Sequence, residues 1–178
     1  MRLLLTTALT AVLWADGAVP RKSAADYPAH GELPTFSMGG EYLAHSVPGE
    51  GHTIVVEDYL VVELGLFPTG APIKIPPAGF SLRINSAKRV VPPQPPEMVG
   101  ASLQNWMMPP QQRQPSNDQQ VPASLPHELV VAMALPQVET VKPIAGYLYF
   151  AFRGKLKSVR TLELLYHGQE GDTVLKLK

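Results

Sequence analysis

The sequence predicts a mainly β protein: a two-sheet antiparallel β-sandwich of about seven to eight strands with one or two short helices. Residues 59–67 form a strand-like run, YLVVELGLF, that ends at Pro68. The 19 prolines and 14 glycines interrupt the chain too often for long helices. The last third of the chain holds three alternating apolar runs separated by turns. Because 178 residues suffice for one cored domain, we expect the sandwich to occupy residues 36–178.

The N-terminus has the pattern of a secretory signal peptide over residues 1–15. Arg2 precedes an apolar run at residues 3–14, and Ala15 supplies a small residue for cleavage. The run is about half as long as a membrane-spanning helix requires. We therefore expect export to the periplasm or beyond the cell, with no stable membrane insertion after cleavage. Residues 16–35 lack periodicity and predict a flexible lead-in.

Composition excludes several kinds of site. The chain has no cysteine, which rules out disulfides, thiolate metal ligands and cysteine nucleophiles. Without the signal peptide, 14 basic residues face 15 acidic ones, a formal charge of −1. A net charge near zero gives no reason to expect nucleic acid or an anionic lipid as partner.

The first half of the domain predicts a hairpin followed by the central strand. Strand-like residues 41–47 and 52–57 flank the turn Pro-Gly-Glu-Gly at 48–51. Within residues 59–67, alternation directs one set of side chains into the core: Leu60, Val62, Leu64 and Leu66. Residues 80–85 also alternate, and if this strand pairs with the central one, Arg83 lies across from Glu63.

The middle of the chain predicts two helices and an insert. Residues 96–106 begin with proline and place apolar residues at helical spacing, with Trp106 packing onto the sheet. Residues 107–126 are rich in proline and glutamine and predict an exposed, flexible loop. Residues 127–135 suit a helix, with a strand as the alternative.

Three hairpin-linked strands are expected at the end of the chain, over residues 146–152, 159–166 and 173–178. In the first of these, Leu148 and Phe150 share one face, while Tyr147 and Tyr149 share the other.

Several of these segments resemble known proteins. The sequences EYL at 41–43, DYLVVE at 58–63, FSLRIN at 80–85 and GYLYF at 146–150 look like those of a family of exported, uncharacterised bacterial proteins. The later stretch also resembles bacterial immunoglobulin-like (telokin-like) domains. This resemblance covers about residues 40–106 and 143–178, implies an immunoglobulin-like sandwich, and supplies no catalytic residue.

Common catalytic patterns are missing from the sequence. There is no glycine-rich phosphate loop, and neither Ser81 nor Ser102 completes a nucleophile elbow. Glu57, Asp58 and Glu63 offer carboxylates for glycoside hydrolysis, but the first two are adjacent and point apart on a strand. These patterns favour a protein without enzymatic activity.

Two sets of residues remain as candidate sites. His45 and His52 would lie diagonally on one face of the hairpin if Val47 faces His52, and two imidazoles with a nearby carboxylate can hold Zn or Cu. Alternatively, both are surface residues beside a turn. Tyr59, Tyr147 and Tyr149 predict an aromatic strip on an outer sheet face, which binds a sugar or protein or simply covers half-buried surface.

The sequence thus favours an exported, non-enzymatic module that needs no cofactor and binds another protein or an envelope polymer. The alternative is a small metal-dependent or hydrolytic enzyme that uses the hairpin with His45 and His52.

Overall fold

The computed structural model describes residues 18–49, 53–107 and 126–178, and the side chains of all of these except residues 104–107. Strand β5 (Tyr59–Pro68) lies at the centre of an antiparallel sheet of five strands, as the apolar run predicts. The strand order is β1-β2-β5-β8-β7. The other four strands are β1 (Ala29–Glu32), β2 (Phe36–Tyr42), β7 (Pro93–Gln94) and β8 (Ile144–Ala151).

A three-stranded antiparallel sheet packs on one face of the larger sheet and encloses the main core. It has the order β10-β9-β6 and consists of β6 (Phe80–Ile84), β9 (Leu162–Gly168) and β10 (Gly171–Lys176). The predicted inward side chains of β5 are all fully buried in this core: Leu60, Val62, Leu64 and Leu66. Tyr166 of the smaller sheet meets Phe36 of the larger one edge-on, with ring centroids 5.7 Å apart.

The prediction that Arg83 faces Glu63 is wrong, because the two residues belong to different sheets. Strand β6 pairs with β9, which places Arg83 opposite Glu163 at an Nη1 to Oε2 distance of 3.2 Å. Glu63 instead lies within 3.3 Å of the Arg21 guanidinium.

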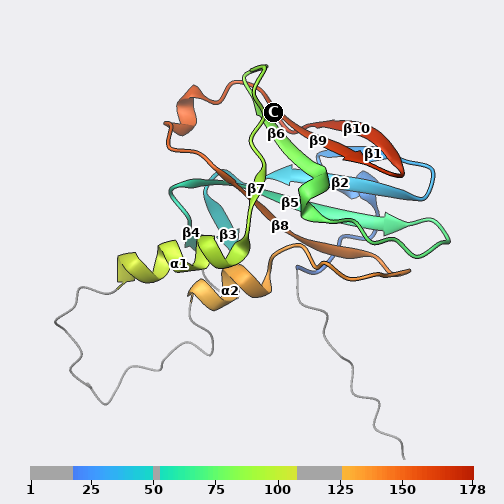
Figure 1. Cartoon of the computed structure of the whole chain (residues 1–178), viewed down its shortest axis with the longest axis horizontal. Coiled ribbons are helices and arrows are strands. Elements are labelled where there is room, and N and C mark those ends of the chain that lie inside the picture. Colours follow the sequence, from blue (N-terminus) through green and yellow to red (C-terminus); the bar gives the residue numbers. More distant parts are fainter. Residues whose placement is uncertain (1–17, 50–52, 108–125) are drawn as a thin grey trace, which may run out of the picture.

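The opposite face of the larger sheet is covered by two helices and a hairpin. Helix α1 (Pro96–Met107) confirms the first helix prediction. Helix α2 (Pro126–Ala132) confirms the second up to residue 132, after which Ala134 forms a parallel β-bridge with Tyr147. With hairpin strands β3 (Ser46–Pro48) and β4 (Thr53–Val55), the two helices form a second apolar cluster over β5 and β8. Figure 1 shows the resulting layers: the smaller sheet, the larger sheet, and then the helices.

The predicted hairpin exists, but its register differs from the prediction. Val47 pairs with Ile54 rather than with His52, which brings two buried apolar side chains onto the same face. The predicted strand at 41–47 is also divided, because Glu41 belongs to β2 and the chain turns at Ala44, whose φ is 57°.

The segment before β2, for which we expect a flexible lead-in, contains regular structure from residue 18 onward. The Ala18 amide donates to the Ala145 carbonyl of β8 at 3.0 Å. A short 3-10 helix, η1 (Ala24–Asp26), then places Tyr27 flat over Gly65 of β5, and β1 pairs with β2. Backbone pairing and one buried aromatic ring hold this segment, although it has little apolar content.

The fold is mainly β and sandwich-like. The described residues contain ten strands in three antiparallel sheets, two α-helices, and the further 3-10 turns η2 (Pro77–Gly79) and η3 (Leu156–Ser158). No helix among them is long and apolar enough to cross a membrane. The expected signal peptide, residues 108–125 of the expected insert and the Trp106 side chain lie outside the description.

Candidate functional site: a basic end of the sandwich

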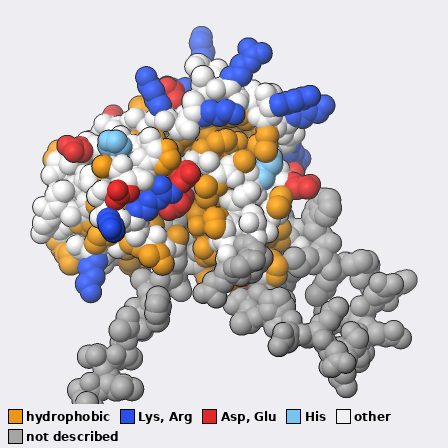
Figure 2. Space-filling view, turned by 180° about the vertical axis from the view of Figure 1, so that it is seen from behind, with side chains coloured by type: hydrophobic (Ala, Val, Ile, Leu, Met, Phe, Trp, Pro, Cys, Tyr) orange, Lys and Arg blue, Asp and Glu red, His pale blue; other side chains and the backbone are white. Residues whose placement is uncertain are grey.

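One end of the sandwich carries a concentration of positive charge, which we call the basic end. Two connections form it: residues 85–91, between β6 and β7, and residues 152–161, between β8 and β9. They contain no Asp or Glu and hold six exposed cations, Lys88, Arg89, Arg153, Lys155, Lys157 and Arg160. Most Lys and Arg side chains in Figure 2 gather at the top of the view, where Figure 1 places these connections.

Carboxylates border the basic end without neutralising it. Glu163 forms its ion pair with Arg83. The turn at Glu57 and Asp58 adjoins the second connection, since the Phe152 amide donates to the Asp58 carbonyl at 2.8 Å. No ion pair joins a described carboxylate to any of the six cations. Their field therefore extends into solvent, where it attracts anions.

The side chain of Asn85 ties the two connections together. Its amide nitrogen donates to the Ser158 carbonyl at 2.7 Å. Its amide oxygen accepts from the backbone N–H groups of Arg160 at 2.7 Å and Thr161 at 3.2 Å. The backbone that carries Arg160 is thereby fixed, while its guanidinium remains exposed. Such preorganisation lowers the ordering cost of binding.

The turn at Asn85 and Ser86 adopts a strained conformation. Both residues have positive φ, 52° and 56°, and the Ala87 amide donates to the Ile84 carbonyl at 3.1 Å, as in a type I′ turn. Asparagine tolerates this region and glycine prefers it, whereas serine is strained there. The Ser86 hydroxyl makes no hydrogen bond to another described residue.

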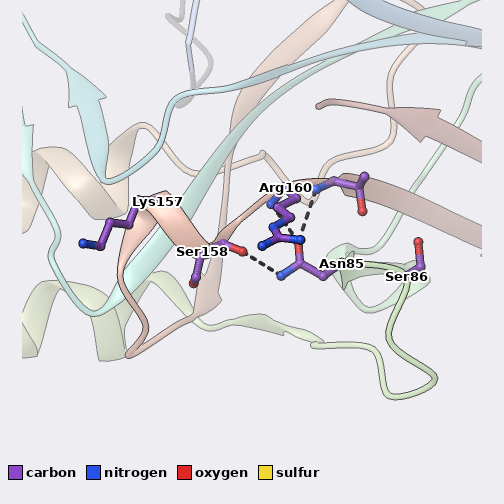
Figure 3. A pocket seen from close by; sticks show the side chains of 6 residues that line it. Asn85, Ser86, Lys157, Ser158 and Arg160 are labelled. Atoms are coloured by element: carbon purple, nitrogen blue, oxygen red, sulfur yellow. Dashed lines mark hydrogen bonds between the residues drawn. The ribbon is translucent and has the colours of Figure 1, made fainter.

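A polar hollow of about 470 Å³ lies between the two connections. Figure 3 shows Asn85 and Ser86 on one side and the η3 connection, with Lys157, Ser158 and Arg160, on the other. Thr161 completes the lining. The hollow thus presents hydroxyls, two cations and no carboxylate, a set of groups that suits an anionic ligand.

The metal site expected at His45 and His52 is untested, because His52 lies outside the described residues. The Nδ1 atom of His45 lies 2.5 Å from the Tyr59 carbonyl oxygen, so this nitrogen carries the proton. The imidazole ring lies near Phe152, with ring centroids 6.5 Å apart. Within the described part of the chain, no three His, Cys, Asp or Glu side chains are grouped to hold a metal.

The expected exposure of the tyrosine strip is wrong. Tyr147 and Tyr149 do share a face, but the helices cover them, and their exposed fractions are 5% and 1%. Tyr149 donates its hydroxyl to the Val130 carbonyl of α2 at 2.8 Å. Burial raises the pKa of Tyr147 to about 12 and the pKa of Tyr149 still further. Tyr59 is half-buried at the edge of the same cluster.

A second charged cluster fixes the N-terminal segment to the sheet. Arg21 pairs with Glu41 and Glu63, and its guanidinium carbon lies 4.3 Å from the centre of the Tyr27 ring. Burial lowers the pKa of Arg21, but the two carboxylates outweigh burial and hold it above its usual value. The Glu63 carboxylate considered for hydrolysis is therefore engaged in an ion pair.

The net charge of the chain does not reveal the basic end. A formal charge of zero for the whole chain hides its distribution, whereas two acid-free segments with six of the 15 Lys and Arg residues are visible in the sequence. Folding is what brings the two segments together.

Comparisons with known proteins leave the family open. No protein-family model matches the chain, and no curated protein is significantly similar, so the resemblance to exported bacterial proteins is not confirmed. A solved structure of a lipoprotein candidate (ycdA) from Bacillus subtilis aligns with a TM-score of 0.40 and 12% identity. The alignment covers 88% of this chain and 38% of that one, and similarity at this level does not establish a shared fold.

Proposed function

We propose that the protein is an exported, non-enzymatic β-sandwich module that binds an anionic component of the cell envelope through its basic end. The observation that carries the proposal is the pair of acid-free connections with six exposed cations, joined by Asn85. Clustered cations on a rigid scaffold attract and retain polyanions.

Two further observations support this proposal. The signal-peptide pattern of residues 1–15 favours export, where an envelope component is the available polyanion. The carboxylates of Glu41, Glu63 and Glu163 are engaged with Arg21 and Arg83, an arrangement that favours structural roles over catalysis.

Cosedimentation of the protein with washed cell envelopes tests the proposal. The binding variant combines Lys155→Glu, Lys157→Glu and Arg160→Glu. A matched control makes the same change in charge at exposed lysines elsewhere, Lys22→Glu, Lys74→Glu and Lys142→Glu.

The unmodified protein and the control are expected to bind at low salt and to be released as salt rises, because counterions compete for the anion. The binding variant is expected to lose at least about tenfold in affinity. The proposal would be contradicted if both triple variants lost affinity for the envelopes equally. It would also be contradicted if binding to the envelopes did not depend on the salt concentration.

A further inference from the structure

We infer that the ligand of the basic end is a linear phosphate-bearing polymer, which lies in the polar hollow between the Asn85 turn and η3. This inference rests on the proposed function and specifies its ligand. The alternatives that the experiment must separate are a polymer of carboxylates and an anionic bilayer.

The donors around the hollow suit a tetrahedral anion. Ser86 contributes a hydroxyl from one connection, and Lys157, Arg160 and Thr161 contribute two cations and a hydroxyl from the other. Neither the Ser86 nor the Thr161 hydroxyl is used by another described residue. A planar carboxylate is satisfied by one guanidinium fork, whereas the oxygens of a phosphate point in several directions and accept from both walls at once.

The strain at Ser86 supports a ligand-binding role for this turn. A φ of 56° costs serine about 1 kcal/mol, and glycine would adopt the same turn without that cost. Strained residues of this kind cluster at ligand sites. The residue kept in this strained conformation is a serine that lines the hollow, and its hydroxyl is a group that can donate to a phosphate.

One observation favours a linear polymer over a bilayer. None of the exposed large apolar side chains of the described chain lies within residues 85–91 or 152–161, and peripheral membrane binding commonly buries such residues.

Phe152 is the one aromatic residue of the two connections, and it is half-buried beside the His45 ring. This disfavours a nucleic acid, whose bases stack on exposed rings in single-stranded complexes. A polymer without aromatic groups suits the hollow, because the hollow is lined by hydroxyls and cations. The ligand class is therefore a chain of phosphates or phosphodiesters without bases.

The experiment measures affinities of the full protein for three probes at the same low salt: long-chain polyphosphate, polyglutamate of equal charge, and vesicles of phosphatidylglycerol with phosphatidylcholine. Polyphosphate is expected to bind at least about tenfold more tightly than either of the others. Ser86→Gly and Thr161→Val remove the two hydroxyls but leave every cation in place. Each is expected to weaken polyphosphate binding about threefold or more and to leave polyglutamate binding unchanged.

Ser86→Gly also relieves the strained φ, so its melting temperature should be equal or higher, and a loss of affinity could not then be attributed to unfolding. Equal affinity for polyphosphate and polyglutamate, tighter binding to vesicles, or full affinity in both hydroxyl variants would overturn the inference while leaving anion binding intact. Failure of all three probes to bind would overturn the proposed function itself.

Discussion

The contact between Tyr27 and Gly65 gives a sharp test of how the N-terminal segment is held. A Cβ atom at Gly65 would lie 2.5 Å from the Tyr27 hydroxyl oxygen and 2.7 Å from Cζ, closer than non-bonded atoms approach. The Gly65→Ala substitution therefore forces the ring, and the segment that carries it, away from the sheet. Overpacking of this kind costs about 1 to 3 kcal/mol.

Removal of the Tyr27 ring should destabilise the protein more than Gly65→Ala does. It should also abolish the destabilisation that Gly65→Ala causes. Tyr27 is 2% exposed, and it meets Phe67 edge-on at 6.2 Å between ring centroids. Its loss in Tyr27→Ala is expected to destabilise the protein by about 3 to 5 kcal/mol. In that background, Gly65→Ala should be neutral or stabilising by up to about 1 kcal/mol, because alanine suits a strand better than glycine and now fills vacated space.

Urea unfolding of the two single variants and the double variant, followed by far-UV circular dichroism, gives the coupling energy between the sites. We expect a coupling of about 2 kcal/mol. A penalty at residue 65 that is the same with and without the Tyr27 ring would show that the ring does not pack there.

Three other predictions concern a core residue, a strained turn and the ionisation of buried tyrosines. Val62→Asp places an unpaired charge at a fully buried position between the sheets and should abolish the cooperative thermal transition, so an unchanged melting temperature would contradict the assignment of the core. Ala44→Gly should raise stability by about 1 kcal/mol in urea unfolding because it relieves a φ of 57°, and a loss of stability would show that the turn is not strained. Burial raises the pKa values of Tyr27 and Tyr147 from 10.0 to about 12, so the stability they contribute is complete below pH 10 and is lost as pH rises toward 12. Substitution of both by phenylalanine should reduce the loss of stability at alkaline pH, leaving the part due to Tyr149 and Tyr166, and a loss of unchanged size would contradict the contribution of Tyr27 and Tyr147.

The central strand was predictable because its signal is local. Strand β5 combines β-branched residues with a proline at its end, and burial on one face follows from alternation alone. Helix α1 was predictable for the same reason, since Pro96 and apolar spacing are local features.

Strand β1 was not predictable, because its sequence Ala-His-Gly-Glu carries no strand signal and its pairing with β2 comes from the backbone. The sequence also does not predict which residues lie opposite one another on neighbouring strands. The alternation pattern pairs Arg83 with Glu63 only if both lie in one sheet, and a local pattern does not encode which sheet a strand joins.

The surroundings of the candidate sites likewise depend on tertiary contacts that a local sequence pattern does not encode. Alternation places Tyr147 and Tyr149 on one face, yet only the folded chain shows that helices from elsewhere in the sequence cover them. The cations of the basic end are visible in the sequence, but the hydrogen bonds of Asn85 that bring the two connections together arise from tertiary structure.

The surface on which a polyanion binds is the most direct test of the role of the basic end. Titration of the isotope-labelled protein with polyphosphate at low salt, followed by amide chemical shifts, maps that surface residue by residue. We predict shift changes confined to residues 85–91 and 152–161, which contain the six cations and the hollow between the two connections. Changes centred on another surface, or no changes at all, would contradict the account.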